Sequence, residues 1–127
     1  MRSRSSALGK ERRIDGVTIR LLPAGAFRLE GRILSTDAVD AVQSCLLRFH
    51  EKASKRSQRI VVDVASLEWI SDAAVTVLVS WILKIQREQM GKQYLIEFHI
   101  NSSVPWQRGT FFALARIAPD VVSVAGV

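Results

Sequence analysis

The sequence RIVVDVASLEWISDAAVTVL at residues 59–78 decides the fold, because it changes within a few residues from the pattern of a strand to that of a helix. Residues 60–64 are almost continuously β-branched, which is typical of a central strand covered on both faces. Ser71 and Asp72 then supply a capping hydroxyl and a first-turn acid for a helix. Its predicted apolar face contains Val75, Leu78, Val79, Ile82 and Ile85. We expect this helix to end at Gly91.

Two strands are predicted before this stretch. Apolar and polar residues alternate over residues 17–21 and again over 27–33, so each strand has one buried and one exposed face. Pro23, Ala24 and Gly25 between them are typical of a turn. The two strands are therefore expected to form a hairpin.

Further elements flank the central stretch on both sides. After Ser35-Thr36-Asp37, the apolar spacing predicts an amphipathic helix of about four turns. Residues 94–100 predict a strand, and a short helix is expected from Pro105 until Pro119 stops it. Residues 121–124 predict a last strand or a docked extension. This order predicts an α/β fold with a small mixed β-sheet and helices packed on it.

Length and composition indicate one domain. The chain has 127 residues, of which 48% are hydrophobic and 24% charged, as in soluble globular domains. No apolar run approaches the roughly 18 residues of a membrane-spanning helix, and the basic start of the chain lacks the apolar run of a secretory signal. We therefore expect a cytoplasmic protein. Residues 1–13 hold five basic residues and one acid, so they are predicted to be a basic flexible tail, with the domain at 14–127.

The sequence lacks the residue patterns of common catalytic and metal sites. The single cysteine, Cys45, and the two histidines, His50 and His99, have no zinc-site spacing. Lys92 follows a glycine, but the other residues of a phosphate-binding loop are absent. We therefore expect no enzyme activity, no metal and no cofactor.

The stretch at residues 59–78 resembles the central signature of the STAS domain, the module of anti-sigma-factor antagonists and of the cytoplasmic tails of sulfate transporters. In the resemblance, Asp63 matches the aspartate at the strand end and Ile70 the apolar residue before the motif. Val75 and Leu78 match core positions of the following helix. The element order resembles the STAS fold over residues 14–124, which implies a regulatory module that binds proteins.

The motif departs from the family pattern at three positions. Ser71 stands where the family usually has Asp, Asp72 stands on the Ser or Thr that a kinase phosphorylates, and Ala74 replaces the usual Gly. A carboxylate carries about one negative charge, whereas phosphoserine carries roughly 1.5 to 2. Asp72 is therefore expected to imitate the phosphorylated state only in part. Alternatively, Ser71 and Asp72 are simply a helix cap and a first-turn acid.

The resemblance also places a partner-binding surface at the start of this helix and on one of its flanks. Trp81 lies one turn after Val77, and tryptophan is enriched at binding hot spots. In the alternative interpretation Trp81 packs under a neighbouring helix, and Trp69 and Trp106 allow the same two interpretations. The predicted partner-binding residues are Ser71, Asp72, Ala73, Ala74, Val77 and Trp81.

Three functions fit these observations. The first is a noncatalytic module of bacterial partner-switching signalling, which binds an anti-sigma factor or a kinase-like protein. The second is a subunit that docks on a membrane transporter or its ATPase, with the basic residues of 2–13 near anionic lipid. The third, nucleic-acid binding, has little support because no aromatic residues interleave with the basic residues. The basic residues in question are those of the predicted tail together with Lys52, Lys55, Arg56 and Arg59.

Overall fold

The computed structural model describes residues 11–23, 25–56 and 59–126, which form one mixed β-sheet and three helices within those ranges. The strands are β1 (Glu11–Ile14), β2 (Val17–Leu22), β3 (Ala26–Ile33), β4 (Arg59–Asp63), β5 (Leu67–Ile70), β6 (Leu95–Ile100) and β7 (Val122–Gly126). The helices are α2 (Thr36–Arg56), α3 (Asp72–Gln86) and α4 (Pro105–Ile117). No helix of the described chain is long and apolar enough to cross a membrane.

The sheet has the strand order β1-β2-β3-β4-β6-β7. Its first three strands are antiparallel neighbours, whereas β4, β6 and β7 continue the sheet in parallel. The first half of β3 pairs with β4 and its second half with β5, so these two short strands lie along the same edge of β3. The predicted small mixed sheet with packed helices is confirmed.

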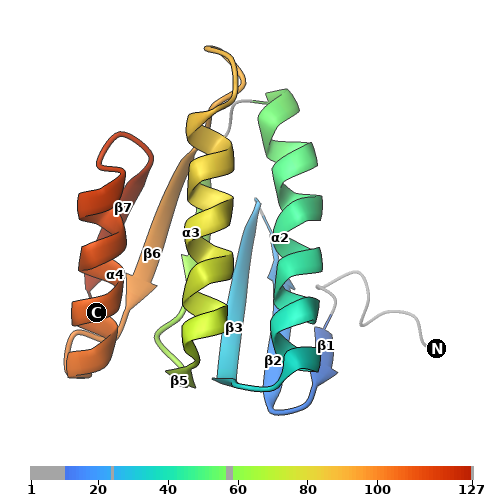
Figure 1. Cartoon of the computed structure of the whole chain (residues 1–127), viewed down its shortest axis with the longest axis vertical. Helices are drawn as coiled ribbons and strands as arrows, with labels where there is room; N and C mark the ends of the chain where they lie inside the picture. The colour runs from blue at the N-terminus through green and yellow to red at the C-terminus, as the bar shows by residue number, and fades with distance from the viewer. Residues whose placement is uncertain (1–10, 24, 57–58, 127) are drawn as a thin grey trace.

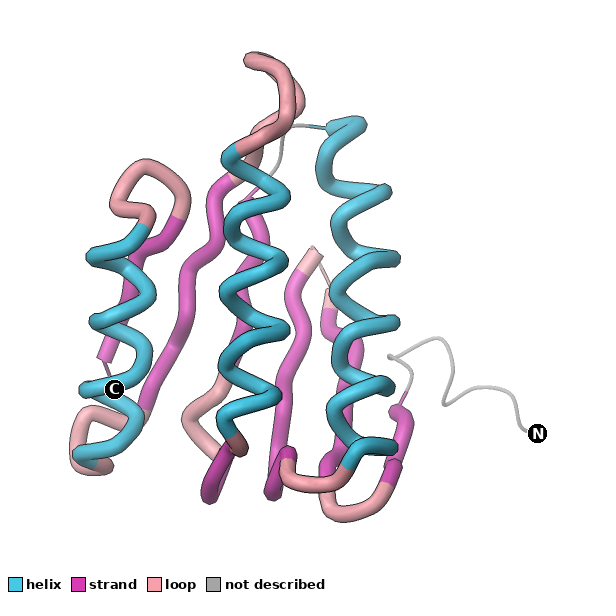
Figure 2. Tube along the Cα trace, viewed as in Figure 1, coloured by secondary structure: helices cyan, strands magenta, loops and turns pink. Residues whose placement is uncertain are grey.

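All three helices lie on one face of the sheet, with α3 between α2 and α4 (Figure 1). Figure 2 shows the same two layers, helices in front and strands behind. The core fills the space between them and contains large side chains that are fully buried, among them Phe27, Leu46, Ile82, Phe98 and Phe111. Burial of this apolar surface supplies the main driving force for folding.

In the described part of the chain, the opposite face of the sheet carries charged side chains and no helix. On β4, Ile60 and Val62 are buried under the helix layer, while Val61 and Asp63 on the other face are half-buried. The prediction of a central strand is confirmed. Helices cover one face of β4, whereas ion pairs among side chains of β4 and the neighbouring strands cover its other face. These pairs are Arg20 with Glu11 and Glu30, Arg28 with Glu30 and Asp63, and Arg59 with Glu97.

The sequence prediction missed two strands. Strand β1 pairs with β2, so the predicted tail of residues 1–13 is wrong for residues 11–13, and residues 1–10 lie outside the described chain. Strand β5 lies between the predicted central strand and the predicted helix, where the sequence pattern indicates no further strand. The predicted hairpin is confirmed, although Ala24 in its turn lies outside the described residues. Two of the basic residues considered for nucleic-acid binding, Lys55 and Arg56, have side chains that also lie outside the described part.

The predicted end of α3 at Gly91 is wrong. The helix ends at Gln86, and Gly91 adopts its left-handed conformation, φ 91°, in the following loop. The side-chain amide of Gln93 donates hydrogen bonds to the carbonyl oxygens of Gln86 and Glu88, at 3.0 and 3.2 Å. These bonds satisfy acceptors that another helical turn would have used.

Candidate functional site

The start of α3 is shaped by Ser71. Its backbone is extended, with φ −79° and ψ 167°, and its Oγ accepts a hydrogen bond from the Ala74 N–H at 3.2 Å. The Ser71 N–H in turn donates to the Ile33 carbonyl oxygen at the end of β3, at 2.9 Å. Ser71 is thus an N-cap that also fixes the helix to the sheet.

Asp72 follows as the first residue of α3, and its side chain is exposed. At this position a carboxylate is stabilised by the positive end of the helix dipole, without any need for burial. Ala73 beside it is exposed as well. The negative charge of Asp72 is therefore presented to solvent on a rigid helix start.

An aromatic pair lies at the same end of the molecule. Trp69 in β5 is 51% exposed, and its ring meets that of Trp106 edge-on, with ring centroids 5.4 Å apart. Trp106, in the first turn of α4, also packs on the buried Phe111 ring at 6.3 Å. The starts of α3 and α4 and strand β5 share this end in Figure 1. We call Trp69, Asp72, Ala73 and Trp106 the α3 cap surface.

A solved structure shares this arrangement of strands and helices. The crystal structure of an anti-sigma factor antagonist from Mycobacterium paratuberculosis is similar to the chain at a TM-score of 0.53, over 87% of this chain and 81% of that one. The chain has the STAS fold. At 11% sequence identity, the similarity concerns the fold. No protein-family model and no curated protein matches the sequence.

The STAS fold buries two of the six predicted partner-binding residues. Ala74 and Trp81 are only 2% and 3% exposed, and Val77 is half-buried. The Trp81 Nε1–H donates to the Tyr94 hydroxyl at 2.8 Å. The structure therefore shows the alternative interpretation, in which Trp81 packs inside the protein. The prediction that Trp81 is an anchor on the partner-binding surface is wrong. Ser71, Asp72 and Ala73 remain at the surface or its margin.

Asp63, the other residue carried over from the STAS resemblance, is positioned by hydrogen bonds within the chain. Its Oδ1 accepts from the Ala65 N–H at 3.1 Å, and its Oδ2 accepts from the Arg28 Nε–H at 3.0 Å. The first bond bends the chain after β4, as is typical of an aspartate at a turn. Asp63 thus shapes the connection that leads to Trp69 and α3.

Gln107 is a positioning residue that the sequence analysis missed. Its side chain is fully buried, and its Nε2 donates to the carbonyl oxygens of Val64, Ala65 and Leu67 at 3.1, 3.2 and 2.9 Å. Its Oε1 accepts from the Asn101 N–H at 2.7 Å. The amide therefore ties the β4–β5 connection to α4 and holds Trp69 next to Trp106. A lone glutamine in an amphipathic helix gives no sequence signal for this role.

A buried chain of polar side chains joins α2, α3 and β6. The Trp81 Nε1–H donates to the Tyr94 oxygen at 2.8 Å. Because the Glu88 carboxylate can only accept, a neutral His50 imidazole carries its proton on Nε2, which donates to Glu88 Oε2 at 2.7 Å. Its Nδ1 then accepts from the Tyr94 hydroxyl at 2.8 Å. Burial raises the pKa of Tyr94 above its usual range. The indole N–H, the phenol hydroxyl and both imidazole nitrogens of this network each have a partner, which is typical of a structural role.

Among the residues that the structure describes, the remaining titratable side chains do not gather into a reactive site. No group of three His, Cys, Asp or Glu side chains within the described ranges could hold a metal ion. Burial raises the pKa of Cys45 to about 11, so its thiol stays protonated at neutral pH. A protonated thiol is a poor nucleophile. The His99 ring is paired with Glu97 at 2.5 Å on the charged face of the sheet.

Proposed function

We propose that this chain is a noncatalytic regulatory module that binds a protein partner through the α3 cap surface, in the manner of an anti-sigma-factor antagonist in the bacterial cytoplasm. The observation that carries the proposal is the exposed Asp72 carboxylate at the start of α3, next to a half-exposed tryptophan pair. The similarity to a solved anti-sigma factor antagonist supports it.

The chemistry of the α3 cap surface favours a protein partner. Two packed tryptophan rings offer a large apolar contact that is already fixed in position, so a partner binds them at little cost in conformational entropy. The charge of Asp72 adds orientation and discrimination between partners. Two cavities lie elsewhere in the fold, beside α2.

Recognition at Asp72 is proposed to be independent of phosphorylation at this position. A carboxylate has no hydroxyl for a serine kinase, and its single negative charge is permanent at neutral pH. The proposed interaction is therefore regulated through the amount or state of the partner, while Asp72 supplies a constant charge.

The test compares Asp72→Asn with Asp37→Asn. Both acids lie in the first turn of a helix and both are exposed, so the two variants lose similar helix-dipole stabilisation, about 0.3–1 kcal/mol each. Affinity capture from a lysate of the source organism identifies the partner, and calorimetry measures its affinity for each variant. We expect Asp72→Asn to weaken binding by about tenfold or more, and Asp37→Asn to leave it unchanged.

Equal affinities of the two variants would reduce Asp72 to a helix-start residue. Capture of a membrane transporter or its ATPase, with the same dependence on Asp72, would favour the alternative function, a subunit that docks on such a transporter.

A further inference from the structure

A cavity of about 520 Å³ lies between α2 and the β1–β2 edge of the sheet. Its volume falls in the range of small-molecule sites, roughly 300–1,000 Å³. It is lined by residues of β1, β2 and α2, and none of them belongs to the α3 cap surface. Any ligand here is therefore independent of the proposed function.

The floor of the cavity is apolar. Ile19 of β2 and Cys45 of α2 are buried, and Leu21 and Phe49 are half-buried beside them. The Phe49 ring is fixed by its contact with the buried Phe27 ring, at a centroid distance of 4.5 Å. An aliphatic chain lying on this floor would remove apolar surface from water, at about 0.8 kcal/mol for each buried methylene group.

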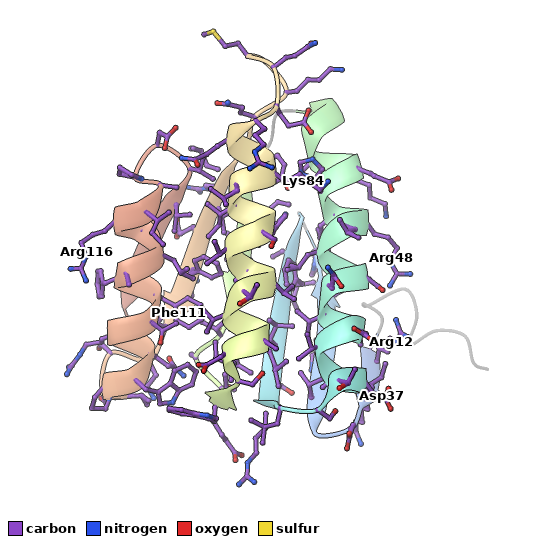
Figure 3. All side chains as sticks on the ribbon, in the orientation of Figure 1. Arg12, Asp37, Arg48, Lys84, Phe111 and Arg116 are labelled. Atoms are coloured by element: carbon purple, nitrogen blue, oxygen red, sulfur yellow. The ribbon has the colours of Figure 1, made fainter. Side chains whose placement is uncertain are left out.

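The rim of the cavity is cationic. Arg48 and Lys52 are one turn apart on α2, and Arg12 reaches the cavity from β1. Figure 3 shows Arg12 and Arg48 on the same side of α2. Among the residues that the structure describes, none of these three side chains forms an ion pair. Each cation is thus available to an external anion.

The acids that line this cavity and the smaller one beside it form no ion pair with Arg48 or Lys52. Glu11 lines the cavity, but its carboxylate bonds Arg13 and Arg20, at 2.8 and 3.1 Å. Asp37 and Asp40 face Arg12 across a separate, smaller cavity. Arg48 and Lys52 are therefore the main positive charges over the apolar floor.

We propose that this cavity binds a single-chain amphiphilic anion, with its acidic head on Arg48 and Lys52 and its aliphatic chain on Ile19, Leu21 and Phe49. A purely apolar ligand would leave the cations without a partner, and inorganic phosphate would leave the floor exposed to water. A cationic amphiphile would be repelled by the rim. Such an anion could be a soluble metabolite or a lysolipid, and these share the same chemistry.

The test titrates the full chain with decyl phosphate, at concentrations below those that form micelles, and follows amide chemical shifts by NMR. We expect saturable shifts around Ile19, Cys45 and Phe49. Decyltrimethylammonium keeps the chain but reverses the charge, and inorganic phosphate keeps the charge but lacks the chain. Saturable binding of either control with the affinity of decyl phosphate would overturn the proposal, as would the absence of decyl phosphate binding.

The variants separate the cavity from general charge attraction. Arg48→Gln combined with Lys52→Gln is expected to lower the affinity for decyl phosphate by about tenfold or more. Arg116→Gln is the matched control, because Arg116 is an exposed helix cation that lies away from the cavity (Figure 3). Equal losses in the two variants would show nonspecific attraction and overturn the proposal.

Vesicles of phosphatidylcholine with and without lysophosphatidic acid distinguish the two sources of the ligand. Extraction of the lysolipid by the chain, together with decyl phosphate binding, would support a lipid source. Decyl phosphate binding without extraction would support a soluble amphiphile. Binding to anionic vesicles alone would overturn the proposal, because it would indicate attraction to a charged surface.

Discussion

The side-chain amide of Gln107 in α4 lies 2.9 Å from the carbonyl oxygen of Leu67, the first residue of β5. Through this bond and two others to Val64 and Ala65, a single buried side chain holds the connection that leads to the α3 cap surface. The position of Trp69 therefore depends on a residue that lies 38 positions later in the sequence.

Replacing Gln107 by Leu is expected to destabilise the protein by about 1–3 kcal/mol or more, because carbonyl groups that are buried with the amide lose their donor. Denaturant unfolding measures the free energy of unfolding. Gln43→Leu is the control, since Gln43 is exposed on α2. A loss of the same size in both variants would contradict the role given to Gln107.

Gly31 is expected to tolerate no side chain. Its φ is 91°, and a Cβ there would overlap the backbone carbonyl oxygen of Gly16. Gly31→Ala should therefore lower the free energy of unfolding by about 3 kcal/mol or more, because strain and overlap add. Gly109→Ala is the matched control: it lies within α4 with open space around it, and should stabilise the protein by about 0.5–1 kcal/mol. Similar stabilities of both variants would contradict this prediction.

The parts of the fold that depend on local patterns were predictable from the sequence. The strand at Ile60 and the start of α3 follow from β-branched residues and from a cap serine, whose effects act over a few neighbouring residues. The exposed Asp72 follows from the same local rule. In contrast, β5 exists because it pairs with β3, with a register shift between Gly31 and Arg32, and such a long-range pairing leaves no periodic signal.

The misplacement of Trp81 has a similar cause. Helical spacing puts Trp81 one turn after Leu78, at the margin of the apolar face, where a large side chain of an isolated helix would be partly exposed. Since α3 lies between α2 and α4, both of its flanks are covered (Figure 1). Tyr94, 13 residues away, also supplies the hydroxyl that makes burial of the indole N–H favourable. Neither the neighbouring helix nor this partner is visible in the local sequence pattern.

Tyr94→Phe tests the buried polar chain. The variant removes the acceptor of the Trp81 Nε1–H and the donor to His50 Nδ1, so we expect a loss of about 1–3 kcal/mol in the free energy of unfolding. In the NMR spectrum the Trp81 indole proton should move to higher field, while the indole protons of Trp69 and Trp106 stay in place. An unchanged Trp81 resonance would show that the hydrogen bond does not form.

Because the Cys45 thiol is buried, we expect the protein to lose stability at alkaline pH. The folded state raises the thiol pKa from 9.0 to about 11, so it holds the proton more tightly than the unfolded chain. This contribution is fully present below pH 9 and is lost as pH rises towards 11. Across this window the wild type should lose about 2–3 kcal/mol more than Cys45→Ala, at about 1.36 kcal/mol per pKa unit. Tyr94 is the same in both proteins, so its contribution to the pH dependence cancels. Parallel pH profiles of the two proteins, each measured by urea unfolding, would contradict the prediction.

Trp69→Ser is expected to weaken binding of the captured partner by about tenfold or more, because it removes half of the tryptophan pair from the α3 cap surface. Leu95→Ser is the matched control, since Leu95 is also 51% exposed but lies on β6 on the charged face of the sheet. Each variant loses one exposed apolar side chain, so their free energies of unfolding should fall by similar small amounts. Calorimetric titration of the partner then separates recognition from stability. If both variants bind as tightly as the wild type, the partner contacts another face of the molecule; if both lose affinity equally, the effect comes from general loss of apolar surface and the tryptophan pair has no special role.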